Sequence, residues 1–98
     1  MKKIETSVSI FKALGDETRL KIISAIIDEP KSVSEIVKQS NESQSCVSHQ
    51  LKFLKEMKIV KNERKGRCVY YSLSDHHIKK IVTQTFLHAS EEHLWKEK

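Results

Sequence analysis

The chain has 98 residues, 38% of them hydrophobic and 32% charged, and its formal net charge is +5. This length fits a single domain over residues 1–98, and no hydrophobic run approaches the length of a transmembrane helix. Two glycines and one proline leave few turns, so we expect a mostly helical chain. No apolar signal-peptide segment follows the first three residues, and we expect a cytoplasmic protein with no membrane partner.

Two helices are expected in the first third of the chain. The apolar residues of 7–14 fall on one side of a helix, which Gly15 ends. Asp16 is a good N-cap for a second helix over 17–28. The second helix has more apolar residues than one narrow stripe requires, so we expect it to be the buried centre of the core, through Leu20, Ile22, Ile23, Ala25, Ile26 and Ile27.

The middle of the chain has the pattern of a helix-turn-helix. Ser32 and Glu35 form a Ser-x-x-Glu capping box for a short helix, and a polar turn follows over 39–42. Ser43 caps a longer helix that reaches about Met57. Its outward side carries residues able to enter a major groove and contact bases, and we predict DNA contacts for Gln44, Ser45, Ser48, His49 and Lys52. The alternative is an ordinary helical hairpin, in which these residues have no such role.

Residues 59–73 are rich in β-forming residues and turn at Lys65-Gly66, which predicts a two-stranded hairpin. We interpret its basic tip as a wing that contacts phosphates or the minor groove through Arg64, Lys65 and Arg67. Residues 44–67 contain seven basic and two acidic side chains, an excess equal to the whole net charge. This concentration of charge predicts a polyanionic partner. The expected fold is therefore mainly α with a small β-hairpin, a winged helix-turn-helix.

The last predicted helix covers residues 75–93 and holds four of the five histidines. His77 and His88 project from one face, about 16 Å apart along the axis, with Asp75 close to the first and Glu91 close to the second. One metal ion cannot reach both half-sites, because metal–ligand bonds are about 2 Å long. An antiparallel second copy would bring residue 77 of one chain against residue 88 of the other. A symmetric homodimer would then hold two identical sites, each with two nitrogen and two oxygen ligands.

Apolar residues lie between the two half-sites, and we expect them to form the dimer seam, namely Ile78, Ile81, Val82, Thr83 and Phe86. The alternative is that the histidines are ordinary surface residues of a terminal helix. Cys46 and Cys68 lie in separate elements and form no CxxC motif. They indicate neither a disulfide framework nor a thiolate metal site.

Three segments together resemble the ArsR/SmtB family of metal-sensing repressors, over nearly the whole chain. They are FKALGDETRL at 11–20, SQSCVSHQLKFL at 43–54 and GRCVYYSL at 66–73. The resemblance implies a homodimer that binds a palindromic operator DNA without metal and releases it when metal binds. The family's zinc sensors carry Asp-x-His, ten residues, His, two residues, then Glu or His in the last helix. The resemblance thus implies the ligands Asp75, His77, His88 and Glu91.

The resemblance also bears on the metal. Arsenic and cadmium sensors of the family share a cysteine pair on the helix before the turn, and residues 33–37 contain no cysteine. Four nitrogen and oxygen ligands fit tetrahedral zinc, so we expect Zn(II) as the regulatory ligand. Ni(II) or Co(II) is the alternative, with His76 or His93 as an extra ligand. A winged-helix DNA-binding protein without a metal response is a further alternative. An enzyme is not expected, because the chain has no glycine-rich phosphate loop and little room for a substrate pocket.

Overall fold

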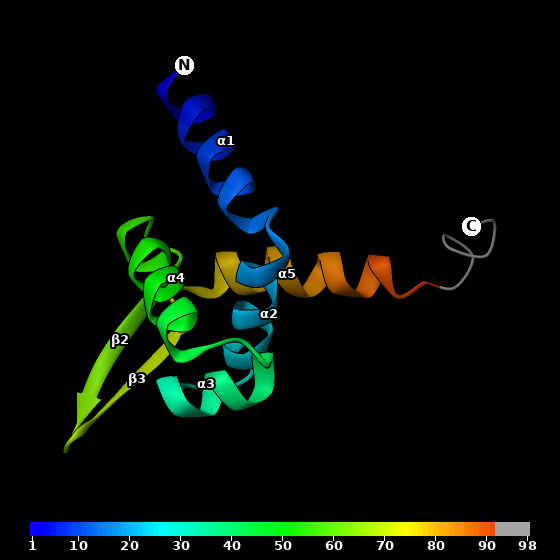
Figure 1. The fold of residues 1–98 in the computed structure, drawn as a ribbon. Coiled ribbons are helices and arrows are strands. Elements are labelled where there is room, and N and C mark those ends of the chain that lie inside the picture. Colours follow the sequence, from blue (N-terminus) through cyan, green and yellow to red (C-terminus); the bar gives the residue numbers. More distant parts are fainter. Residues whose placement is uncertain (92–98) are drawn as a thin grey trace.

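The computed structural model describes residues 1–91 and has the winged helix-turn-helix architecture expected from the sequence (Figure 1). The elements follow in the order α1 (Lys2–Leu14), α2 (Glu17–Ile26), β1 (Lys31–Ser32), α3 (Val33–Ser40), α4 (Gln44–Glu56), β2 (Val60–Lys65), β3 (Cys68–Leu73) and α5 (His76–Ala89). Helix α1 begins at Lys2 rather than at residue 7, and α2 ends at Ile26 rather than at residue 28. In Figure 1, α1 points away from the body formed by the other elements.

Side-chain caps fix where four of the helices begin. Asp16, Ser43 and Asp75 each accept a hydrogen bond from the backbone N–H three residues further on, at 3.0, 3.1 and 3.0 Å. Ser32 and Glu35 form the predicted capping box, in which each side chain accepts from the other residue's backbone N–H. These caps satisfy N–H groups that have no partner within the helix, so the helix starts follow directly from the sequence.

The sheet has three strands in the order β1-β3-β2, all antiparallel. The hairpin of β2 and β3 was predicted, but its turn is one residue further on, because Lys65 pairs with Cys68 and leaves Gly66 and Arg67 as the loop. Gly66 has a φ of +63°, as the first loop residue of a tight hairpin requires. The two-residue strand β1 was not predicted, since so short a strand leaves no alternating pattern in the sequence.

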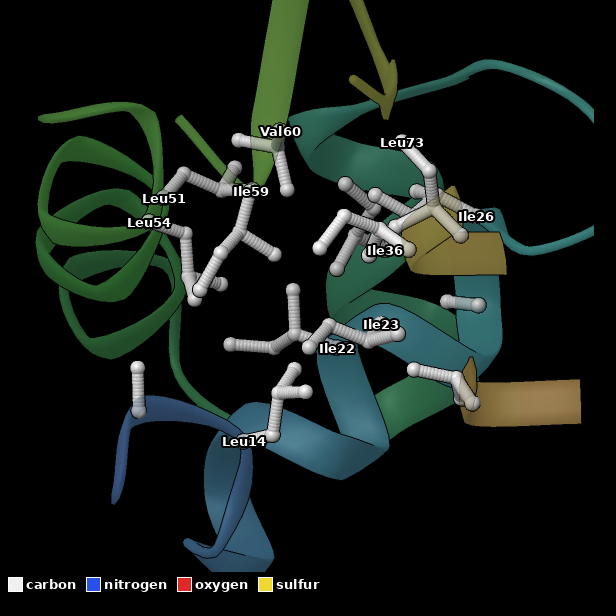
Figure 2. Packing of buried hydrophobic residues seen from close by; sticks show 14 of the residues in the cluster. Leu14, Ile22, Ile23, Ile26, Ile36, Leu51, Leu54, Ile59, Val60 and Leu73 are labelled. Carbon is white, nitrogen blue, oxygen red and sulfur yellow. The ribbon is translucent and has the colours of Figure 1, made fainter. Parts of the chain in front are cut away.

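Helix α2 is the centre of the core, as predicted. Ile22, Ile23 and Ile26 are almost fully buried against residues from α3, α4 and the hairpin. Figure 2 shows these side chains meeting Ile36, Leu51, Leu54, Ile59, Val60 and Leu73. Burying one isoleucine side chain is worth about 1.5–3 kcal/mol, so α2 is the element that holds the helix-turn-helix and the hairpin together.

The expected dimer seam on α5 is largely wrong. Ile78 and Val82 are 8% and 2% exposed and belong to the core of their own subunit. Phe86 also packs against this core, whereas Ile81 is 39% exposed. The reason is that α5 packs into the core of its own subunit, and this packing covers the side of the helix that holds most of its apolar residues.

Candidate DNA-binding surface and metal half-sites

Helix α4 presents a polar face to solvent. Its apolar residues Val47, Leu51 and Leu54 are buried, as predicted. All the predicted base-contacting residues are exposed, namely Gln44, Ser45, Ser48, His49 and Lys52. This exposed face therefore contains small and hydrogen-bonding side chains without a bulky apolar group, which is what entry into a major groove requires.

The basic wing tip lies at the far end of the hairpin. Arg64 and Lys65 end β2, and Arg67 is the second residue of the loop. All three are exposed. Figure 1 shows that the hairpin projects away from the helices, so the tip can reach a surface beside the one that α4 meets. The structure thus provides a polar helix and a separate cationic arm on one domain.

The two residues of each predicted metal half-site lie close together within one subunit. Asp75 Oδ1 lies 3.6 Å from His77 Nδ1, and Glu91 Oε1 lies 3.4 Å from His88 Nδ1. The histidine side chains are 74% and 73% exposed. The pKa of Asp75 is lowered, chiefly because its carboxylate accepts the backbone N–H of Ile78 and also because His77 is close. Asp75 is therefore an ionised oxygen donor at neutral pH.

The two half-sites lie at opposite ends of one exposed face of α5. At 100° per residue, the positions of His77, Ile81, Gln84 and His88 fall within about 60° of each other around the helix axis. All four residues are exposed. Within residues 1–91, no three His, Cys, Asp or Glu side chains gather in a way that could hold a metal ion. One subunit therefore offers two donors at each end of this face rather than a complete site.

Two further histidines bear on the half-sites. The ring of His76 lies against that of His77, with centroids 4.2 Å apart. This places a further nitrogen donor beside the first half-site. His93, the other candidate for an extra ligand, lies outside the described residues.

The exposed apolar face of α1 was missed in the sequence. Ile4, Val8 and Phe11 are 58%, 46% and 63% exposed, and their spacing puts them on one side of the helix. Phe11 also lines, with Ile81 of α5, an apolar hollow of about 220 Å³. The i, i+4, i+7 spacing of these residues was a usable signal, but such a stripe is normally assigned to the core of its own chain.

The cysteines have no site around them in the part of the chain that the structure describes. The Cys46 thiol lies 3.7 Å from a carboxylate oxygen of Glu42. Partial burial and this carboxylate raise the pKa of Cys46 above its usual value, so the thiol is protonated at neutral pH. Cys68 is exposed on the wing.

No helix within residues 1–91 has the length and hydrophobicity needed to cross a membrane.

Comparisons with known proteins identify the family. Residues 16–62 match the family model described as bacterial regulatory protein, arsR family. The chain is 39% identical over 83 residues to a cadmium resistance transcriptional regulatory protein CadC homolog of Staphylococcus aureus, an alignment that covers 84% of this chain and 69% of that protein. The chain belongs to the arsR family.

A second relative of this ArsR-family protein is a transcriptional repressor SmtB homolog of Synechocystis, 38% identical over 81 residues, or 83% of this chain and 61% of that protein. The chain thus spans roughly two thirds of the length of each of these two relatives. Members of the family are DNA-binding transcriptional regulators, so the protein is a DNA-binding transcriptional regulator and not an enzyme.

Solved structures agree with the fold. The homodimeric winged helix-turn-helix domain of Mb0332 from Mycobacterium bovis superposes with a TM-score of 0.84 at 21% identity, covering 93% of this chain and 84% of that one. Reduced HlyU from Vibrio cholerae gives a TM-score of 0.83 at 27% identity, covering 92% and 95%. The winged helix of the ArsR-family protein is therefore shared beyond the residues that match the family model.

Proposed function

We propose that this ArsR-family protein is a homodimeric repressor that binds a palindromic operator and releases it when Zn(II) binds between the α5 helices. The observation that carries the proposal is the exposed α5 face, with a carboxylate–histidine pair at each end. His77 and His88 need no structural partner in the subunit core, since both are nearly three-quarters exposed.

A second subunit completes both sites at once. If two α5 helices pack antiparallel through this face, the Asp75–His77 pair of one meets the His88–Glu91 pair of the other. The two-fold axis then passes near Ile81 and Gln84 rather than through Val82, which is buried in its own subunit. An isologous contact of this kind repeats every interaction twice.

The apolar surface of α1 supports the same assembly. Ile4, Val8 and Phe11 leave a contiguous apolar stripe in solvent, and Phe11 reaches the hollow that Ile81 lines. A stripe of this kind on a small domain indicates a protein contact. We assign the dimer seam to this face of α1 together with Ile81, in place of the residues of α5 that turn out to be buried.

The donor chemistry supports zinc. Each completed site would contain two imidazole nitrogens and two carboxylate oxygens, a set that suits tetrahedral Zn(II). No cysteine lies on α3, so a thiolate site at that position is not available for a softer metal. Bound between subunits, a divalent cation would favour the dimer arrangement in which its ligands meet. Operator release then requires that this arrangement places the two α4 helices at a spacing that the operator half-sites do not match.

On the DNA side, we assign base contacts to the exposed residues of α4 and phosphate contacts to the wing. Gln44, Ser45, Ser48 and His49 present donors and acceptors at the N-terminal half of α4, and Lys52 lies further along it. The wing contributes Arg64, Lys65 and Arg67. These charges and the rest of the basic segment supply the attraction to DNA that does not depend on sequence. The cytoplasmic location expected from the sequence is consistent with this role and stays a prediction.

The proposal is tested by operator binding, measured by fluorescence anisotropy with and without zinc, for the wild type and for His77→Ala. We expect zinc to lower operator affinity in the wild type and to have little effect in the variant, because His77→Ala removes one ligand from both sites of the dimer. Zinc-independent binding by both proteins would contradict the proposal and leave a winged-helix protein whose α5 only dimerises.

The same titration with Ni(II) and Co(II) tests the choice of metal. His76 supports a larger ligand set, because its ring already lies against that of His77. A stronger response to nickel or cobalt than to zinc, lost in His76→Ala, would replace Zn(II) by the six-coordinate alternative. We expect instead that His76→Ala leaves the zinc response unchanged.

A further inference from the structure

Arg19, in the first turn of α2, touches both the recognition helix and the end of α1. Its Nε–H donates to Gln50 Oε1 at 2.9 Å, and its guanidinium carbon lies 4.2 Å from the centre of the Phe53 ring. Its Nη1 donates to the carbonyl oxygen of Ala13 at 3.5 Å. These contacts join three helices through one partly buried side chain.

The contact of Arg19 with α4 is a hydrogen bond and therefore directional, whereas α4 otherwise packs against the core through apolar side chains. Val47, Leu51 and Leu54 decide which face of α4 is buried, and a hydrogen bond from a fixed donor then constrains the rotation of the helix more narrowly than non-directional apolar contacts do. Within residues 1–91, the Arg19–Gln50 hydrogen bond is the one described between a side chain of α4 and another helix or strand. Gln50 directly follows Ser48 and His49, so the rotation that this bond fixes also decides where those two residues point.

The contact of Arg19 with the Ala13 carbonyl oxygen lies next to the proposed dimer seam. Ala13 is in the last turn of α1, two residues after the exposed Phe11. The backbone of Arg19 is itself held, because its N–H donates to the Asp16 cap at 3.0 Å. Because the backbone of Arg19 is held in place, a shift of α1 relative to α2 changes the distance between the Ala13 carbonyl oxygen and the Arg19 guanidinium.

We propose that Arg19 is a positioning residue that sets the orientation of α4 relative to the end of α1 and so couples the subunit interface to operator recognition. The proposal rests on the dimeric, metal-released repressor proposed above. Arginine suits this role because its planar guanidinium donates in several fixed directions while stacking on an aromatic ring. A lysine retains the charge but cannot hold all three contacts.

The test compares Arg19→Lys and Arg19→Gln with the wild type. Affinities for the operator and for random DNA are measured over a range of salt concentrations, and the operator titration is repeated with zinc. We expect both variants to bind the operator about tenfold more weakly, with unchanged affinity for random DNA and an unchanged salt slope. We also expect the ratio of zinc-free to zinc-bound operator affinity to shrink, because the path between the interface and α4 is loosened.

Two outcomes would overturn the proposal. If Arg19→Gln weakens binding to all DNA and lowers the salt slope by about one, while Arg19→Lys does not, Arg19 contacts a phosphate. If both variants only lower the urea midpoint and bind the operator like the wild type where they are folded, the residue is purely structural.

A double-mutant cycle with Gln50→Leu separates this proposal from the metal mechanism. If Arg19 acts on α4 through Gln50, the losses in operator affinity from Arg19→Lys and Gln50→Leu are not additive, whereas additive losses contradict the path. This readout needs no zinc, so it still decides the role of Arg19 if the metal response proves absent. Lys21→Ala is the matched control, since Lys21 also lies on α2 but pairs with Glu42 in the turn before α4. We expect it to leave operator affinity unchanged.

Discussion

In α3, α4 and the hairpin the apolar residues are covered within the subunit, by α2 and by each other, whereas on the face formed by α1 and α5 several apolar residues are left exposed. In the first region, capping side chains hold both helix starts, the apolar residues of α4 are buried, and polar or basic residues face solvent. In the second region, Phe11 and Ile81 are exposed, and each predicted metal half-site has two donors. This difference is what the proposed function would explain, with the first region assigned to DNA and the second to a second copy of the chain.

The largest expected effect comes from placing a charge in the apolar face of α1. Phe11→Asp should weaken the dimer at least about 100-fold, because two phenyl side chains per dimer lose their burial, each worth about 1.5–3 kcal/mol, and two carboxylates replace them. Sedimentation equilibrium measures the change.

Ser9→Asp is the matched control for this prediction, since it adds the same charge on the opposite side of the same helix, where Ser9 is exposed. Equal dimer affinities for Phe11→Asp and the wild type would show that α1 lies outside the interface.

A second prediction separates the capping role of Asp75 from its role as a ligand. Asp75→Asn should keep the N-cap of α5, since asparagine caps as well as aspartate, but should lower zinc affinity at least about tenfold by removing an anionic ligand. Asp75→Ala should lose zinc affinity and, in addition, about 1 kcal/mol of unfolding free energy. Competition with a zinc-binding dye and urea denaturation measure the two quantities. Unchanged zinc affinity in Asp75→Asn would remove Asp75 from the ligand set.

A third prediction concerns the two kinds of DNA contact. Ser48→Ala and His49→Ala should weaken operator binding by about 1–3 kcal/mol and affect random DNA little, because base-edge contacts depend on sequence. Arg67→Ala and Lys65→Ala should weaken binding to all sequences and lower the salt slope by about one each. Anisotropy titrations on operator and random duplexes distinguish the two. Equal losses on both duplexes for Ser48→Ala would contradict its assignment to base contacts.

The smallest expected effect is a change in unfolding free energy from the backbone strain at Lys58, in the first of the two regions. Lys58, in the turn after α4, has a φ of +62°, a conformation that costs a residue with a side chain roughly 1 kcal/mol. Lys58→Gly should therefore be more stable than Lys58→Ala by about 1 kcal/mol, although both lose the same charge. Urea denaturation measures the difference. Asn41→Gly, at a φ of +60°, should gain less, because asparagine tolerates this conformation.

The comparison between the two regions also separates what could and could not be read from the sequence. The capping box of Ser32 and Glu35 and the cap by Asp16 were predicted correctly, because each depends on residues three apart. The close approach of His88 and Glu91 was expected for the same reason. The hairpin turn was placed one residue early, since the register of a hairpin depends on pairing along both strands, whereas the sequence indicates only that Gly66 belongs to the loop.

By itself, the sequence determined the starts of the four capped helices, α2 to α5, together with the central position of α2, the polar face of α4 and the arrangement of donors along α5. These follow from spacing at 3.6 residues per turn and from hydrogen bonds between near neighbours, which act the same way in any surroundings. Only the tertiary structure decided which apolar residues of α5 are covered, because Ile78, Val82 and Ile81 are all apolar and differ in whether they reach the core of their own subunit. It also decided that Arg19 meets Gln50, a contact between residues 31 positions apart that no local pattern indicates.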